Sequence, residues 1–151
     1  MTLTCISFEN GQPIPIEHSC KGTDSSPALS WSGVPKNTVS FALICDDPDA
    51  PIGTWIHWVY FNIPSELTAL PAAVPAGDKP EIGGIQGRNS WRKNSYGGPC
   101  PPSGTHRYFF KLYALDAFLD LGPSANKKKV LDTIEGHVLA QAELMGTFAK
   151  R

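Results

Sequence analysis

The chain has no long apolar run and no internal repeat. None of its hydrophobic stretches approaches the roughly 18 residues needed to span a bilayer. The N-terminus also lacks the basic start and the extended apolar segment of a secretory signal peptide. These absences predict a globular protein of the cytoplasm that does not insert stably into a membrane.

Neither sign of charge dominates. Thirteen Lys and Arg residues face fourteen Asp and Glu residues, for a net charge of −1. Such a chain has no overall field to attract nucleic acid or an anionic membrane, so nucleic acid is excluded as a partner. Any bound anion has to be held by a local site. The only run of like charge, Lys127-Lys128-Lys129, is predicted to be a solvated helix face.

Cysteine motifs are absent as well. No Cys-x-x-Cys pair occurs among the four cysteines, Cys5, Cys20, Cys45 and Cys100. This argues against a zinc knuckle and against a thioredoxin-type redox motif. Because the cytoplasm keeps thiols reduced, we expect four reduced and mostly packed cysteines.

What the chain does contain is enough apolar sequence for a core. It has 151 residues, of which 41% are hydrophobic and 18% charged, and this predicts one domain spanning residues 1–151. The apolar run Phe41–Cys45 is typical of a central strand buried on both faces. Four segments are rich in β-branched and aromatic residues and are predicted to be strands: Leu3–Phe8, Val39–Cys45, Trp55–Ile63 and His106–Leu115.

A single helix is predicted over Ala125–Glu135, with Ser124 as its N-cap and Gly136 as its stop. Apolar and polar residues alternate over Val138–Phe148, which indicates a closing strand. The Pro- and Gly-rich stretches 64–80 and 89–104 are predicted to be loops. Many strands and one helix favour a mainly β protein, an antiparallel β-sandwich with one peripheral helix and long loops.

Two segments carry the candidate chemistry. In Asp47-Pro48-Asp49-Ala50-Pro51 the two prolines stiffen a turn that holds two carboxylates directly after an apolar strand. In the second segment, strand alternation places His106 and Tyr108 on one face and Arg107 on the other. The pair Pro101-Pro102 leads a rigid loop into this strand.

A second histidine lies on the preceding predicted strand. Alternation assigns Trp55, His57 and Val59 to one face, whereas Ile56, Trp58 and Tyr60 point to the other. His57 is therefore expected among large apolar side chains. We predict that Asp47, His57 and His106 converge on one pocket.

These motifs resemble the phosphatidylethanolamine-binding protein family, which includes the Raf kinase inhibitor protein. Asp47–Pro51 is similar to its first signature and Pro101–Tyr108 to its second. Further similarity covers Ser26–Trp31, Trp55–Pro64 and His137–Phe148. The chain is most similar to the short bacterial and archaeal branch, because it lacks the extra carboxy-terminal helix that borders the pocket in the animal proteins.

The resemblance implies a β-sandwich that binds small anions or phosphorylated headgroups and is not an enzyme. It implies no cofactor. A signalling role through inhibition of a kinase is also implied, but less directly than the pocket itself. The side chains that would line this pocket are Asp47, Asp49, His57, Pro102, His106 and Tyr108.

The physics of such a pocket requires a positive group. A carboxylate 4 Å from a bound phosphate costs about 4 kcal/mol at an effective dielectric constant near 20. Protonated His57, protonated His106 or an amine of the ligand would supply the charge, and a zwitterion such as phosphoethanolamine suits this mixture. Tyr108 can donate to a phosphate oxygen, and Gly97-Gly98-Pro99 would let the backbone approach the ligand.

Four alternatives stay open at this point. A Cys100/His106 pair would be the nucleophile and base of a hydrolase, although no Gly-x-Ser-x-Gly elbow is present. Asp47, Asp49, His57 and His106 offer ligands for zinc, although no His-x-x-x-His pair occurs on a helix. A surface loop such as Ser90–Pro102 would inhibit a protein kinase or a protease by entering its cleft. The sequence also leaves a homodimer open.

Overall fold

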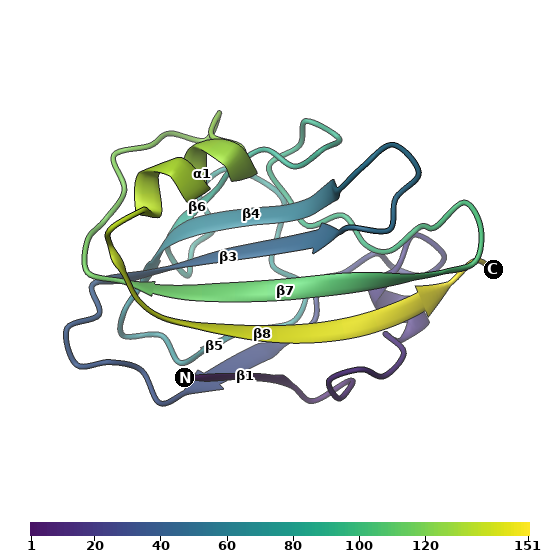
Figure 1. Ribbon diagram of the computed structural model, residues 1–151, viewed down its shortest axis with the longest axis horizontal. Helices are drawn as coiled ribbons and strands as arrows, with labels where there is room; N and C mark the ends of the chain where they lie inside the picture. Colours follow the sequence, from purple (N-terminus) through teal and green to yellow (C-terminus); the bar gives the residue numbers. More distant parts are fainter.

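The computed structural model describes residues 1–151 and contains two antiparallel sheets with one α-helix (Figure 1). The three-stranded sheet consists of β1 (Thr2–Cys5), β2 (Leu29–Ser32) and β5 (Ala69–Leu70), in that order. The five-stranded sheet runs in the order β6 (Ile85–Gln86), β4 (Trp55–Pro64), β3 (Ser40–Asp47), β7 (Thr105–Leu115) and β8 (Val138–Ala149). The prediction of a mainly β sandwich is confirmed.

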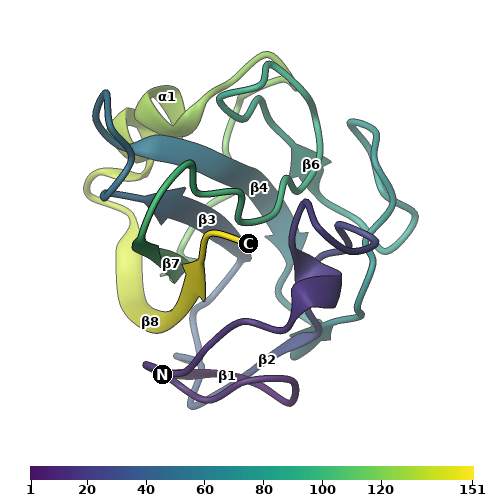
Figure 2. The same cartoon turned by 90° about the vertical axis from the view of Figure 1, so that its right-hand side faces the viewer.

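The core has two parts, one on each side of the five-stranded sheet. The larger part fills the space between the sheets, which Figure 2 shows with β1 and β2 on one side and β3, β4, β7 and β8 on the other. The smaller part lies between the five-stranded sheet and the helix. Strand β3 contributes to both, with Phe41, Leu43 and Cys45 facing the other sheet and Ala42 and Ile44 facing the helix side. It is the central strand, as predicted.

The helix α1 spans Lys127–Ile134, two residues later at its start than predicted. Its cap is Asn126, not Ser124, because the Asn126 side chain accepts a hydrogen bond from the backbone N–H of Lys129. Lys127 also departs from the predicted solvated face: its Nζ lies 2.6 Å from Oδ2 of the buried Asp46. This ion pair fastens the helix to β3.

Short strands escaped the sequence analysis. The four-residue strand β2 was not predicted, and β5 and β6 have two residues each, too few for a detectable alternation. The predicted closing strand is confirmed as β8, and its outer edge is covered by residues 11–14, which donate to Met145 O and Thr147 O. None of the helices has the length and hydropathy required to cross a bilayer.

One cysteine pair forms a disulfide, contrary to the expectation of four reduced thiols. Cys20 and Cys100 are 80 residues apart in sequence, yet their Cα atoms are 5.5 Å apart. Cys5 and Cys45 are free. The expectation rested on the cellular compartment, whereas the pairing follows from the fold, which brings a 3-10 turn over Ile16–His18 beside the loop that precedes β7.

Candidate functional site

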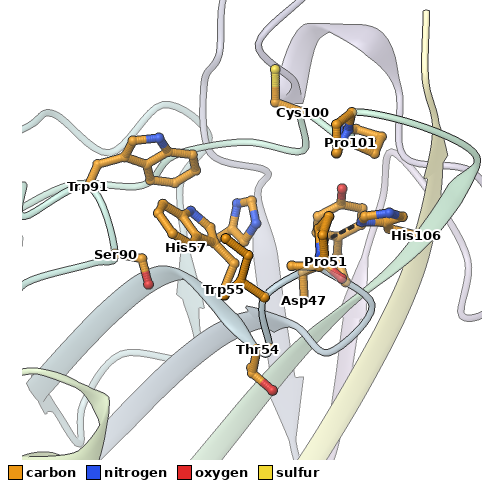
Figure 3. A pocket seen from close by; sticks show the side chains of 15 residues that line it. Asp47, Pro51, Thr54, Trp55, His57, Ser90, Trp91, Cys100, Pro101 and His106 are labelled. Carbon is orange, nitrogen blue, oxygen red and sulfur yellow. Dashed lines mark hydrogen bonds and ion pairs between the residues drawn. The ribbon is translucent and has the colours of Figure 1, made fainter.

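A cavity of about 730 Å³ opens where β3 ends and β7 begins (Figure 3). This volume lies within the range of about 300–1,000 Å³ typical of small-molecule pockets. Its walls come from the turn after β3, the start of β4 and the loop before β7. The lining residues are Asp47, Ala50, Pro51, Ile52, Gly53, Thr54, Trp55, His57, Ser90, Trp91, Cys100, Pro101, Pro102, His106 and Tyr108.

Five of the six residues proposed from the sequence line this cavity, and Asp49 does not. Asp49 instead accepts three hydrogen bonds from Arg107, from the backbone N at 2.9 Å, from Nε at 2.9 Å and from Nη2 at 2.8 Å. These contacts lower the pKa of Asp49 to about 2. Because Arg107 points to the opposite face of β7 from His106 and Tyr108, Asp49 ties the turn to β7 outside the cavity.

His106 is held by Asp47. The imidazole Nδ1 lies 2.7 Å from Asp47 Oδ2, and both side chains are buried. The second oxygen of Asp47 accepts from the backbone N of Asp49 at 2.7 Å, which fixes the carboxylate in the turn. With Nδ1–H donating to Asp47, Nε2 of His106 has no protein partner and is open to the cavity.

His57 is anchored in the same way, but to the backbone. Its Nδ1 lies 2.7 Å from the carbonyl oxygen of Gly97. Burial lowers the pKa of His57, while the bond to Gly97 and the charge of Asp47 oppose this shift. His57 is therefore neutral near pH 7, with Nδ1–H donating and Nε2 available as an acceptor.

A β-bulge aims His57 at the cavity. Cys45 pairs with Trp58 whereas Asp46 pairs with Ile56, so His57 is the extra residue on β4. The bulge breaks the alternation assumed from the sequence, and Val59 packs on the helix side while the His57 ring lies 5.1 Å from that of Tyr108, edge to face. The predicted shared face of His57 and Val59 is therefore wrong.

The hydroxyl of Tyr108 is the one buried side-chain oxygen or nitrogen atom without a hydrogen-bond partner. Burial, and after it the charge of Asp47, raises the pKa of Tyr108. The Cys100 backbone lies close enough to oppose this shift in part, but it does not reach hydrogen-bonding geometry. Because buried hydroxyls are normally paired, this group is an unfilled donor, and it belongs to a residue that lines the cavity.

Two tryptophans lie at the mouth of the cavity: Trp55, which strand alternation had assigned to the face of His57, and Trp91, which the sequence analysis missed. Trp55 and Trp91 are 38% and 40% exposed, and their rings meet edge to face at 5.4 Å. The Trp91 ring also lies 5.1 Å from that of His57. The signal available in the sequence was a Trp within a Gly- and Pro-rich loop, but only the tertiary structure places Trp91 beside His57.

Gly97 and Gly98, in the loop that precedes β7, allow close packing within the protein. A Cβ at Gly97 would collide with the Trp91 ring, and a Cβ at Gly98 would collide with the carbonyl oxygen of His18. Neither glycine lines the cavity. The expectation that this segment brings the backbone to the ligand is corrected: the missing side chains make room for Trp91 and His18.

A family model for phosphatidylethanolamine-binding protein matches residues 4–149. The chain belongs to the phosphatidylethanolamine-binding protein family. It is 51% identical over 150 residues to a UPF0098 protein of Methanothermobacter thermautotrophicus, with 99% of each chain covered. It is 48% identical to a UPF0098 protein of Aquifex aeolicus, over 95% of this chain and 85% of the relative.

Solved structures agree with this assignment to the family. A homolog of the phosphatidylethanolamine-binding proteins from Chlamydia trachomatis superposes with a TM-score of 0.92 at 39% identity, covering 99% of this chain and 97% of the other. YbcL of Escherichia coli, described as a member of the mammalian family, gives a TM-score of 0.90 at 32% identity, covering 99% and 98%.

Two alternatives lose support in this member of the phosphatidylethanolamine-binding protein family. No three His, Cys, Asp or Glu side chains gather in an arrangement that would hold a metal ion, so the zinc site considered from the sequence is not formed. While it is bonded to Cys20, Cys100 offers no thiolate to act as a nucleophile with His106.

Burial of His57 predicts that stability falls in acid. The folded pKa of His57 lies below its unfolded value, so the unfolded chain binds more protons as the pH drops below about 6.5. Stability that is full above this pH is lost progressively below it. His57→Asn should reduce this pH dependence of stability, because an amide does not titrate in this range. The asparagine amide can still donate a hydrogen bond to the carbonyl oxygen of Gly97. Chemical denaturation from about pH 8 to 5 measures both proteins. Identical slopes in the two would show that His57 does not titrate between the states.

Proposed function

We propose that this protein binds a small phosphorylated ligand, of the phosphoethanolamine type, in the cavity beside His106 and Tyr108. The observation that carries the proposal is the buried Tyr108 hydroxyl, which has no partner within the protein. Leaving such a group unpaired costs roughly 1–3 kcal/mol, and an acceptor oxygen of a ligand in the cavity would remove this cost.

The charge for the anion comes from His106. In its protonated form this imidazole donates from Nδ1 to Asp47 and from Nε2 into the cavity. The pair of Asp47 and protonated His106 is neutral overall. A phosphate oxygen placed at Nε2 therefore meets a cation first, with the carboxylate behind it, and avoids the repulsion of about 4 kcal/mol that a bare carboxylate at 4 Å would cause.

His57 selects the other end of the ligand. Because burial keeps its imidazole neutral, Nε2 accepts a hydrogen bond and favours a donor. An ammonium group or a protonated phosphate oxygen provides that donor. The sequence left either histidine as the cation, and because burial keeps His57 neutral, the proposal gives this role to His106. A zwitterion that carries both a phosphate and an amine satisfies His106, Tyr108 and His57 together.

The proposal contains no catalytic step, and the protein acts by binding. Inhibition of a kinase or a protease through Ser90–Pro102 stays a prediction, as does a homodimer. That segment contributes Ser90, Trp91 and Cys100 to the cavity wall, which favours a small ligand over insertion into the cleft of another protein.

Tyr108→Phe tests the proposal because it deletes only the unpaired hydroxyl. Binding of phosphoethanolamine should weaken about tenfold to hundredfold, since a hydrogen bond to a charged group contributes roughly 1.5–3 kcal/mol. The free energy of unfolding of the ligand-free protein should not fall, because no hydrogen bond within the protein is lost. Calorimetric titration and chemical denaturation measure the two quantities.

Tyr113→Phe is the matched control, because Tyr113 lies further along β7 and does not line the cavity. It should leave the affinity for phosphoethanolamine unchanged. If Tyr108→Phe binds as tightly as the unmodified protein, the phosphate does not sit at this hydroxyl and the proposed site is wrong.

A further inference from the structure

The disulfide forms part of the rim of the cavity. Cys100 is one of the lining residues (Figure 3), and both Cys100 and its partner Cys20 are exposed. The two free thiols differ from them. Cys45 is buried, and this burial raises the pKa of its thiol, while Cys5 is half-buried with its sulfur 3.1 Å from Ser7 Oγ. A reductant in solution therefore meets Cys20–Cys100 directly.

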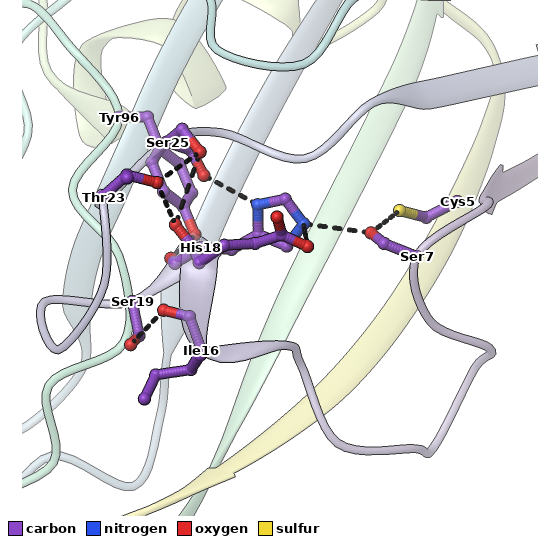
Figure 4. A network of polar contacts seen from close by, with 9 residues as sticks. Cys5, Ser7, Ile16, His18, Ser19, Thr23, Ser25 and Tyr96 are labelled. Carbon is purple, nitrogen blue, oxygen red and sulfur yellow. Dashed lines mark hydrogen bonds and ion pairs between the residues drawn. The ribbon is translucent and has the colours of Figure 1, made fainter.

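The segment that carries Cys20 is held by several hydrogen bonds of its own. Two residues before Cys20, the buried His18 ring joins Ser25 O at 2.8 Å and Ser7 Oγ at 3.0 Å (Figure 4). The hydroxyl of Tyr96 donates to the carbonyl oxygen of His18 at 2.6 Å. None of these bonds involves the disulfide, so we expect them to hold the segment in place after reduction as well.

The Cys100 side is held by little else. Hydrogen bonds fasten the loop as far as Pro99, whose carbonyl accepts from the backbone N of Cys20 at 3.1 Å. Residues 100–103 neither donate nor accept a hydrogen bond, and Pro101 and Pro102 have no N–H to offer. The next tie is at Gly104, whose carbonyl accepts from Lys150 N. Apart from the burial of Pro101, the disulfide is thus the one specific link between residues 100–103 and the rest of the protein.

We propose that Cys20–Cys100 is a thiol–disulfide exchange site that controls the cavity, closing its wall when oxidised and releasing it when reduced. The reductant is a dithiol. One of its thiolates attacks a sulfur of the disulfide, and the other cysteine leaves as a thiolate and takes up a proton. The second thiol of the reductant, as a thiolate, then attacks the reductant sulfur of this mixed disulfide and releases the remaining protein cysteine as a thiolate, which takes up a proton. The protein thus gains two thiols and the dithiol becomes a disulfide.

The effect on ligand binding rests on the proposed function of the cavity. If residues 100–103 hold the closed position only a fraction of the time after reduction, the apparent dissociation constant rises by the inverse of that fraction. We expect phosphoethanolamine to bind about tenfold more weakly to the reduced protein. By reciprocity, saturating ligand should lower the reduction potential of the disulfide by about 30 mV for a tenfold difference.

The experiment compares oxidised protein, protein reduced with dithiothreitol, and Cys100→Ser by calorimetric titration with phosphoethanolamine. Thiol titration confirms the state, with two thiols expected before reduction, Cys5 and Cys45, and four after it. Reduction and Cys100→Ser should weaken binding equally, reoxidation should restore it, and dithiothreitol should not change Cys100→Ser. Cys5→Ser, outside the disulfide, is the control and should respond to reduction as the unmodified protein does.

A second measurement needs no ligand. The imidazole resonances of His57 and His106 should shift or broaden on reduction, since both rings line the cavity beside the released wall. His137 pairs with Asp116 beyond the far end of β7 and should not change. If four thiols are present while the affinity stays within about twofold and the ring signals are unchanged, the exchange site does not control the cavity. If neither redox form binds phosphoethanolamine, the proposed ligand is wrong, and the ring resonances alone decide the redox control.

Discussion

Cys20→Ser should lower the free energy of unfolding by about 4 kcal/mol under oxidising conditions. The disulfide closes a loop of 80 residues, and in the chain-entropy description such a closure removes many conformations from the unfolded chain. Serine suits the site because Cys20 is exposed, so little packing is lost. Denaturation with guanidinium chloride measures the change, and the denaturant slope should rise because the unfolded chain becomes more extended.

Reduction of the unmodified protein should reproduce the loss, and Cys20→Ser should then be insensitive to reductant. Cys5→Ser is the control, because its thiol closes no loop and its one hydrogen bond, to Ser7 Oγ, can also be made by serine. Its stability should stay within about 1 kcal/mol of the original. Equal stability of oxidised and reduced protein would contradict the prediction.

The sequence predicted the part of the site that lies on regular strands. Strand β7 runs for eleven residues from Thr105 to Leu115 without interruption where the site lies, so alternation correctly separated His106 and Tyr108 from Arg107. The apolar run of β3 likewise identified the central strand and the position of Asp47 at its end. In both cases the local sequence pattern favours the same strand and the same side-chain directions as the tertiary structure.

The rest depended on features that local patterns do not encode. The bulge at His57 reverses the alternation along β4, and nothing in Trp55–Pro64 marks the extra residue. The separation of Asp49 from the cavity follows from the bidentate contact with Arg107, 58 residues away. Trp91 and the disulfide partner of Cys100 were missed for the same reason: their neighbours are set by loops that the tertiary fold brings together.

His106→Ala should weaken phosphoethanolamine binding about a hundredfold, because it removes both the proposed cation and its hydrogen bond. In the unmodified protein, the imidazolium mechanism predicts that binding weakens between about pH 6 and about pH 8, the range in which histidine side chains in general change charge. The phosphate gains negative charge over the same interval, which alone would strengthen its attraction to a fixed cation. A fall in affinity therefore reports loss of the proton from the protein.

Two variants separate this mechanism from its competitors. His57→Asn should keep the pH dependence of phosphoethanolamine binding, because burial already holds His57 neutral and the asparagine amide preserves the hydrogen bond to Gly97. His106→Ala should remove it, and because this variant leaves Asp47 buried without its partner, its folding has to be verified by denaturation. Calorimetric titration at both pH values measures each protein. Affinity that is flat or higher at about pH 8, or unchanged in folded His106→Ala, would overturn the imidazolium mechanism and leave Tyr108 as the remaining donor for the phosphate.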